Sequence, residues 1–474
     1  MNYPVWEVPL IGSQLVIAII AIFHVLVSHF AVGGGFYLPM AEMLARRRGD
    51  RAWRDVVKKH SRFFLIFTAV FGTITGVGIW FSIGLANPEA TSTLIHYFVF
   101  GWAMEWVVFL VELTTIAVYY YTWDRIPDAL HIKVGWAYAI ASWLTLVIIN
   151  GILCFMLTPG DTWLGVVGSG KETHVFWNAF FNPTYWPSLV IRTLFCMCIA
   201  GCFALLTASR IDGEKQPQLK ADIIRWSVRW LIPLFVLLPF AGAWYLWQVP
   251  AVQRHILELG FSTIGQGTFS IVTRMVLMFV LSFATLLAIV YLLAYRSPRD
   301  FKLGSAIVII LLMQAAIAST EMTREMLRKP FVITRHMYSN GVRISQVADY
   351  NQNGYLTKSP WVSAENRQAW AALDAQGVAA TNAPDYQAKM LVRGQRMFRG
   401  QCLACHTVDG YRSMRDFVAA RDHKGIGNVL AMLHENKADS PYHAFMPPLV
   451  GIPGEIAALN LYLDCLVTPS PAKK

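Results

Sequence analysis

The chain has 474 residues, of which 55% are hydrophobic and only 15% are charged, and its mean hydropathy is +0.44. Soluble domains carry about 25% charged residues, so the composition excludes a soluble globular protein and indicates an integral membrane protein. The formal net charge of +11 does not indicate nucleic-acid binding, because the basic residues gather in alternate loops between apolar segments.

Eight apolar segments are long enough to cross a membrane, which takes about 20 residues. We expect no cleavable signal peptide, because no basic segment precedes the first span and that span is too long for a signal sequence. The predicted fold class is all-α, a polytopic transmembrane helix bundle followed by a small helical domain. The predicted spans are residues 13–43, 62–86, 94–122, 134–157, 187–208, 227–248, 268–294 and 303–328.

Basic residues follow the odd-numbered spans. The loop after the first span is the richest, and the loops after the even-numbered spans hold only Lys171 and Arg254. Cytoplasmic loops carry the excess of lysine and arginine, so both termini are predicted to lie outside the cytoplasm. We therefore expect a multi-pass protein of a bacterial cytoplasmic (inner) membrane with its C-terminal domain in the periplasm.

The stretch RGQCLACHTVDG, residues 399–410, contains Cys402, Cys405 and His406 in the spacing that attaches a c-type haem. Covalent haem c is matured outside the cytoplasm, the side that the charge distribution independently assigns to this segment. We expect one covalent haem c here, held by Cys402 and Cys405 with His406 as an iron ligand. Residues 385–474 resemble a class I cytochrome c, with a helix leading into the motif and a closing helix in PGEIAALNLYLDCL.

The second axial ligand is predicted to be Met446, in the proline-rich stretch HAFMPPLVG. Methionine and histidine together ligate iron in cytochromes c. Other side chains in the domain compete for this role: Met414, Met432, His423, His434 and His443. Residues 336–384 connect this domain to the predicted bundle of residues 1–335. Within the connector, DYNQNG resembles the start of a calcium loop, but Pro360 stands where a bidentate glutamate is required, and we interpret the stretch as turns.

Ionisable residues inside the predicted spans are costly and are functional candidates by default. Two glutamates in span three, Glu105 and Glu112, are seven residues apart and share a helical face. The other candidates are Arg274 in span seven, Glu321, Glu325 and Arg328 in span eight, and His24 and His29 in span one. These residues could be buried ion pairs that hold the bundle together, or they could form a haem site whose arginines neutralise propionates.

The first span, AIIAIFHVLVSHFAVGGGFYLPMAEM, is similar to the first helix of cytochrome bd quinol oxidase subunit I. The stretch FLVELTTIAVYYYTWDR matches that family's third helix, and EMLRKPF resembles its Glu-x-x-Arg-x-Pro-Trp motif. The resemblance covers roughly residues 10–335. It implies that His24 and Glu325 are iron ligands and that Glu112 belongs to the haem pocket and proton path. It also implies that Glu105 is the nearest candidate for the family's second glutamate, although its spacing is one residue short. Arg274 and Arg328 would lie near haem propionates.

Several features depart from that family. The histidine of its low-spin haem is replaced by Arg192 or Ile191, and the corresponding methionine position is Val276. The external quinol-binding loop has shrunk, and the haem c module replaces a ninth span. The pattern thus resembles a branch of the superfamily with a fused cytochrome c.

We expect electrons to enter at haem c from a periplasmic c-type cytochrome and to pass to two non-covalent haems, b and/or d, in the bundle. Glu105 and Glu112 would serve as proton donors or ligands while oxygen or another small oxidant is reduced. Two alternatives stay open: a quinol dehydrogenase that exports electrons through haem c, and a non-catalytic electron-wiring subunit. The resemblance also implies a second membrane subunit. His29 either serves a further haem or is packed in the core, which we favour.

Overall fold

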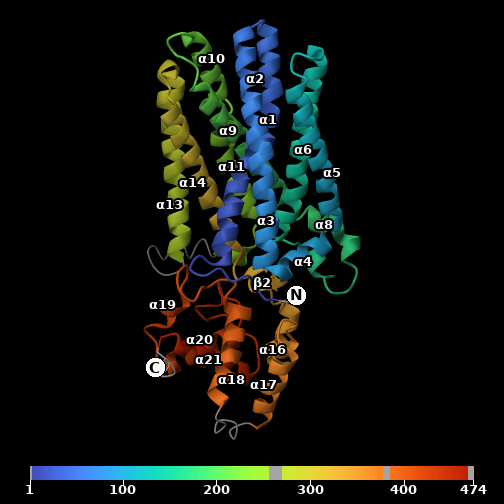
Figure 1. The fold of residues 1–474 in the computed structure, drawn as a ribbon, viewed down its shortest axis with the longest axis vertical. Helices are drawn as coiled ribbons and strands as arrows, with labels where there is room; N and C mark the ends of the chain where they lie inside the picture. The colour runs from blue at the N-terminus through green and yellow to red at the C-terminus, as the bar shows by residue number, and fades with distance from the viewer. Residues whose placement is uncertain (1–2, 256–268, 377–384, 468–474) are drawn as a thin grey trace. The chain divides into compact units, whose positions relative to one another are not determined.

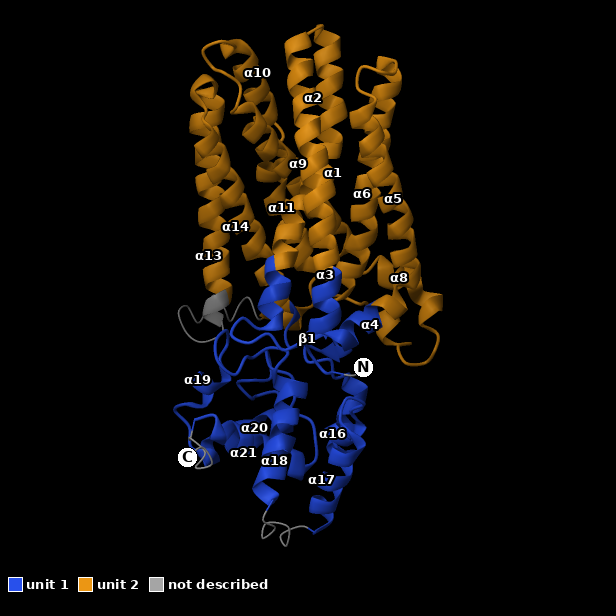
Figure 2. Cartoon of the chain, viewed as in Figure 1, with its two compact units in different colours: residues 1–19, 80–94, 328–474 blue, residues 20–79, 95–327 orange. Residues whose placement is uncertain are grey.

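The computed structural model describes residues 3–255, 269–376 and 385–467, and most of them are helical (Figure 1). Two compact units make up the chain (Figure 2). The bundle unit comprises residues 20–79 and 95–327, and the C-terminal unit comprises residues 1–19, 80–94 and 328–474. The ends of three helical spans, residues 13–19, 80–86 and 328, therefore belong to the same unit as the predicted haem domain.

The prediction of eight spans is confirmed, because the described residues contain eight helices long and apolar enough to cross a membrane. The corresponding helical segments are α1 (Ser13–Arg48), α2 with η1 and α3 (Arg51–Ile66, Phe67–Gly72, Thr73–Ala86), α5 (Val99–Tyr121), α6 (Asp128–Phe155), α9 (Tyr185–Ala208), α10 with α11 (Pro217–Val228, Ile232–Gln248), α13 with η3 (Phe269–Ile289, Val290–Arg296) and α14 (Leu303–Arg328). Short helices lie between them: α4 (Pro88–Tyr97), α7 (Asp161–Leu164), η2 (Glu172–Val175), α8 (Phe176–Phe180) and η4 (Pro298–Asp300).

The basic segment after the first span is mostly helical rather than a loop. Only Gly49 and Asp50 separate α1 from α2, with Gly49 at a φ of +65°. The Asp50 side chain accepts a hydrogen bond from the Trp53 backbone N–H at 2.9 Å and so caps α2. Both helices thus extend past the apolar segments that the sequence delimits.

Close packing of small residues brings α1 against α9. A Cβ atom on Gly33 would lie 1.8 Å from the Cys196 carbonyl oxygen, so only glycine allows this approach. Small residues let membrane helices come close enough for van der Waals packing to stabilise them. The same contact places Arg192 of α9 near the part of α1 that carries His29.

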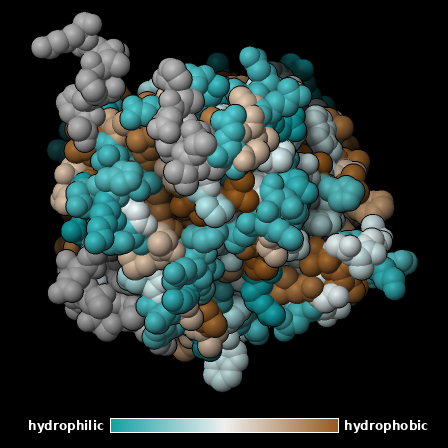
Figure 3. Space-filling model, turned by 90° about the horizontal axis from the view of Figure 1, so that it is seen from below, coloured by the Kyte–Doolittle hydropathy of each residue, from teal (hydrophilic) through white to brown (hydrophobic). Residues whose placement is uncertain are grey.

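The C-terminal unit contains a hairpin of β1 (Phe331–Ile333) and β2 (Met337–Tyr338) and a set of short helices around its own apolar core. Figure 3 shows a face on which hydrophilic residues predominate. The helices are η5 (Ile344–Gln346), α15 (Val347–Asn353), α16 (Tyr355–Lys358), α17 (Ala364–Gln376), α18 (Tyr386–Met397), η7 (Phe398–Cys402), α19 (Met414–Val418), α20 (His423–Glu435) and α21 (Pro453–Cys465).

Two predicted helices of this unit are present, as α18 before the haem motif and α21 at the end. The interpretation of DYNQNG as turns is wrong. Its residues up to Asn353 belong to α15, which ends at Gly354 with a φ of +90°. Glycine adopts this positive φ without steric cost, so the helix can end here despite the preference of asparagine and aspartate for turns.

Candidate functional site

His24 of α1 has a ring nitrogen available for a metal. Its Nδ1 lies 2.9 Å from the Thr75 hydroxyl, and that hydroxyl donates its own proton to the Phe71 carbonyl oxygen at 2.5 Å. Thr75 must therefore accept from His24, so Nδ1 carries the proton and Nε2 keeps a free lone pair. A histidine that ligates iron is oriented in this manner by a second hydrogen bond. Gly76 faces the ring, with its ideal Cβ position 3.4 Å from His24 Cε1.

A cluster of ionisable residues lies in the bundle near this histidine. Arg192 and Arg324 both pair with Glu321, with N–O distances of 3.6 Å and 2.9 Å. His29, which is only 5% exposed, lies within electrostatic range of Arg192, Glu321 and His24. The cluster thus joins α1, α9 and α14. Of its members, the sequence indicates Glu321 as an intramembrane acid and Arg192 as a departure from a pattern, but it does not indicate that they meet.

Glu325, the second predicted bundle ligand, follows Arg324 on α14 and lies within electrostatic range of it. Arg274 of α13 is exposed and makes no hydrogen bond or ion pair with the described residues. Arg328 belongs to the C-terminal unit, where its Nη1 donates to the Val332 carbonyl oxygen at 3.3 Å.

Glu105 and Glu112 lie on one face of α5, as their spacing predicts, and interact electrostatically. The Glu112 carboxyl group lies 3.5 Å from the Tyr138 hydroxyl and 3.2 Å from the Thr145 hydroxyl, both on α6. These hydroxyls can hold and exchange a proton with the carboxyl group. Tyr138 and Thr145 are seven residues apart, so the two helices present matching polar positions along their contact.

The predicted haem c motif folds as a turn after η7. Burial raises the pKa of the Cys402 thiol to about 12, with neighbouring Cys405 as a further cause. The His406 Nδ1 lies 3.0 Å from the Arg412 carbonyl oxygen, which can only accept a hydrogen bond. Nδ1 therefore carries the proton, and Nε2 has no hydrogen-bond partner among the described residues. Burial also lowers the pKa of His406, which keeps the imidazole neutral as metal ligation requires.

Met446 is half-buried in the turn that follows α20, and its backbone N–H donates to the Tyr442 carbonyl oxygen at 2.9 Å. Among its competitors, His423 pairs with Asp464, and the exposed His443 bonds to Asn436. Met432 is exposed and Met414 packs in the apolar core, while His434 uses Nδ1 to donate to the Leu449 carbonyl oxygen at 3.0 Å. His434 and the more exposed His443 are thus the competitors whose Nε2 stays available.

The N-terminal segment pairs with the loop after the motif, a contact that sequence analysis missed. The Tyr411 backbone N–H donates to the Leu10 carbonyl oxygen at 2.7 Å, and Leu10 forms an isolated parallel bridge with Gly410. Gly410 has a φ of +120°, and a Cβ atom there would lie 2.2 Å from the Leu10 oxygen. Ser339, after β2, places its hydroxyl 3.9 Å from the Cys405 sulfur. No periodic pattern marks such pairings in the sequence.

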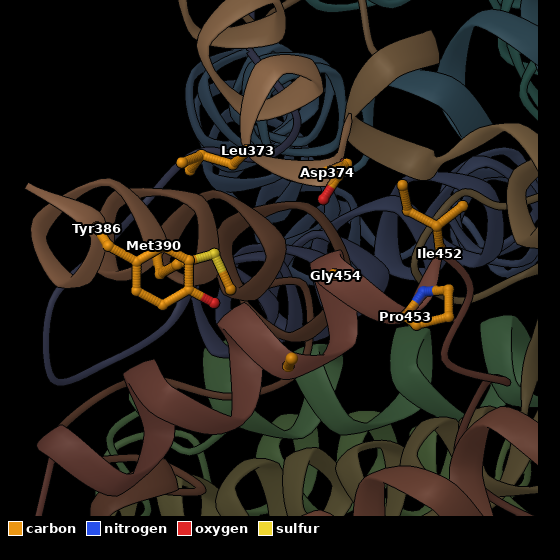
Figure 4. Close-up of a pocket in the computed structure, with 8 residues that line it drawn as sticks. Leu373, Asp374, Tyr386, Met390, Ile452, Pro453 and Gly454 are labelled. Carbon is orange, nitrogen blue, oxygen red and sulfur yellow. The ribbon is translucent and has the colours of Figure 1, made fainter. Parts of the chain in front are cut away.

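A surface pocket of about 330 Å³ lies elsewhere in the C-terminal unit (Figure 4). Its one acidic lining residue, Asp374, already forms two 2.8 Å hydrogen bonds with Arg393. The remaining lining residues carry no charged side chain: Leu373, Tyr386, Met390, Ile452, Pro453, Gly454 and Ala457. The described part of the chain also has no cluster of three or more His, Cys, Asp or Glu side chains suited to a metal ion.

A family model described as cytochrome bd terminal oxidase subunit I matches residues 13–259. His24, Glu105 and Glu112 fall inside this stretch, whereas Arg274, Glu325, Arg328 and the haem c motif lie beyond it. The matched stretch includes all the helices from α1 to α11, which form six of the eight spans.

Two curated proteins are similar over shorter stretches. A putative cytochrome bd menaquinol oxidase subunit I of Bacillus subtilis is 24% identical over 167 residues, 34% of this chain and 36% of that protein. Cytochrome bd-II ubiquinol oxidase subunit 1 of Escherichia coli is 24% identical over 202 residues, 41% and 39% of the two chains. The alignments therefore span less than half of these relatives.

The fold is similar to that of the bd oxidase from Geobacillus thermodenitrificans. The TM-score is 0.53 with 16% sequence identity, over 70% of this chain and 89% of that chain. At this identity the likeness concerns the fold alone, and it agrees with the predicted helical bundle.

Proposed function

The chain belongs to the cytochrome bd terminal oxidase subunit I family, and on that premise we propose that it couples a periplasmic haem c to a haem pair in the bundle. The family makes the chain a respiratory membrane haem protein and an oxidoreductase. In the proposal, electrons come from a periplasmic c-type cytochrome, and oxygen or another small oxidant is reduced.

One observation carries the proposal: His24 and His406 are oriented alike. Each Nδ1 donates to an oxygen atom, of Thr75 or Arg412, and each Nε2 is left with a free lone pair. Neutral imidazole fixed in one tautomer is the form that binds haem iron. Two such histidines in separate units support two separate haem sites, rather than one site and one core histidine.

In the bundle we assign His24 and Glu325 as iron ligands. Glu112 would hold a proton between the Tyr138 and Thr145 hydroxyls, with Glu105 next on the same helix face. In the C-terminal unit, Cys402 and Cys405 would form thioethers, while His406 and Met446 would ligate iron. When bound, haem c supplies a one-electron carrier and the bundle haems, b and/or d, supply the chemistry of oxygen reduction. Arg274 and Arg328 stay proposed propionate neighbours.

We also propose a second membrane subunit. In the most apolar windows of α2–α3 and α5, only 6% and 11% of the residues are buried, compared with 72% in α9. Because α5 carries Glu105 and Glu112 and α3 carries Thr75, these sparsely covered helices belong to the proposed site. A protein partner would shield it from lipid.

Purified full-length protein tests the proposal in two steps. Pyridine-haemochrome analysis should find one covalent haem c and non-covalent haem in each chain. Oxygen uptake should then follow addition of reduced cytochrome c, whereas a quinol analogue should give none. If the analysis found haem c and no other haem, the proposed haem site in the bundle would be wrong. Quinol-driven reduction of an external cytochrome, without oxygen uptake, would instead establish the reverse direction and a quinol dehydrogenase.

A further inference from the structure

The cluster of Arg192, Glu321 and Arg324 carries more positive than negative charge. Glu321 accepts from Arg324 through both Nε and Nη2 at 2.9 Å, and Arg192 Nη2 lies 3.6 Å from its other oxygen. Arg192 also donates from Nε to the Ser188 hydroxyl at 3.4 Å. The exposed fractions of the three side chains are 11%, 22% and 24% for Arg192, Glu321 and Arg324. Two guanidinium groups therefore share one carboxylate.

One hydrogen-bond donor of this cluster is unused. The Nη1 atom of Arg324 is buried and has no hydrogen-bond partner among the described residues. A buried, unsatisfied donor on a charged group destabilises the fold, and an uncompensated charge within a membrane bundle is costlier still. Glu325 lies within electrostatic range of Arg324, but the proposed function commits its carboxylate to iron. The cluster thus lacks one anionic acceptor.

We propose that Arg192, Glu321 and Arg324 form a binding site for a carboxylate, and that this carboxylate is a propionate of a bundle haem. The inference rests on the proposed function and names residues that the resemblance does not assign. A guanidinium group binds a planar carboxylate through paired N–H donors, and Arg324 still has a free donor on Nη1. His29 lies within electrostatic range of the site, and His24 within electrostatic range of His29. His24 lies on the same helix as His29, about 7.5 Å from it along the helix axis.

Charge changes in the cluster should move the midpoint potential of the bundle haem in opposite directions. Arg324→Gln removes a positive charge, stabilises the oxidised haem and should shift the potential downward. Glu321→Gln removes a negative charge and should shift it upward. Arg210→Gln is the matched control, because Arg210 lies exposed just beyond α9 and should leave the potential unchanged. Opposite shifts would not follow from a general loss of folding.

Infrared difference spectra identify the carboxylate. Haem carrying ¹³C-labelled propionates should give redox-linked carboxylate bands that shift in Arg324→Gln and Glu321→Gln but not in Arg210→Gln. Titration with acetate or chloride tests a free anion: potentials that follow their concentration, with propionate bands unchanged, would overturn the assignment. Unchanged bands and potentials in both variants would do the same. Wild-type protein without non-covalent haem would instead reject the proposed function itself.

Discussion

Glu42 of α1 and His131 of α6 form a fully buried pair, with His131 Nδ1 2.9 Å from both carboxylate oxygens. The other ring nitrogen, Nε2, lies 2.8 Å from the Tyr119 carbonyl oxygen. A carbonyl oxygen only accepts, so Nε2 carries a proton. Glu42 also accepts from the Tyr119 hydroxyl at 2.7 Å and from Arg46 Nε at 2.8 Å. The Tyr119 and Arg46 donors hold the Glu42 carboxyl group in place, and its contact with His131 joins α1 to α6.

Glu42→Gln should lower the thermal unfolding temperature of the bundle strongly. Removing one partner of a buried charge pair typically costs about 3–5 kcal/mol, because the other charge remains buried without compensation. Circular dichroism of the purified protein on heating gives the measurement. Asp55→Asn is the control, since Asp55 is exposed on α2 and its replacement should have little effect. If Glu42→Gln unfolds at the same temperature as the wild type, the Glu42–His131 pair does not stabilise the contact between α1 and α6.

Thr75→Val should weaken retention of non-covalent haem while the covalent haem c remains. The substitution removes the acceptor of the His24 Nδ1–H at 2.9 Å, and loss of such an orienting partner lowers metal affinity about 10- to 100-fold. Haem content and visible spectra after purification measure the effect. Thr75→Ser should restore retention because it keeps the hydroxyl. Thr73→Val, at an exposed position of the same helix, should change nothing.

Met446→Leu should keep the covalent haem but lower its midpoint potential. Methionine ligation raises the potential of cytochromes c, and leucine offers no lone pair to iron. Redox titration of the haem c absorbance gives the result. Met432→Leu is the control, because Met432 is 37% exposed. An unchanged potential in Met446→Leu would mean that another side chain is the second iron ligand. His434 would then be the first residue to replace by mutation.

The helical fold was largely predictable from the sequence, because the length of the apolar segments directly indicates the membrane spans. The helix ends were less predictable. Arg51 begins α2 well before the apolar segment starts, because an aspartate cap and amphipathic packing extend the helix. The pairing of Leu10 with Gly410 was not predictable either, since it depends on two loops far apart in the chain.

The candidate site, like the fold, was predictable from the sequence only in part. The predicted haem c motif is local, so the proposal for Cys402, Cys405 and His406 depends on their spacing alone. The contacts of Arg192 with Glu321 and of Glu42 with His131 join residues on different helices, and no sequence period reports which faces meet. Glu42 lies within the first predicted span, whereas its partner His131 lies just before the predicted start of span four. The sequence therefore does not indicate that the two residues form a pair. The signal in the sequence for this pair is an acidic residue close to the basic end of a predicted span.

Glu455 should make the stability of the C-terminal unit dependent on pH. This fully buried carboxyl group accepts backbone hydrogen bonds from Tyr355 and Leu356 at 2.8 Å and from Ile452 at 3.2 Å. Burial nevertheless raises its pKa above the ordinary value of 4.5. The folded state therefore binds this proton more tightly than the unfolded state. Its contribution to stability is complete below pH 4.5 and is lost as the pH rises through the folded-state pKa.

Urea unfolding of the full-length holoprotein, followed through haem c absorbance at several pH values, measures this dependence. The wild-type midpoint should fall as the pH rises above 4.5, whereas Glu455→Gln should lack that part of the slope, because its amide does not titrate. Glu435→Gln is the control: Lys437 lowers the pKa of that exposed carboxyl group, so any effect should be small and of opposite sign. Parallel slopes for wild type and Glu455→Gln would mean that the three backbone N–H donors, rather than burial, dominate the protonation of Glu455.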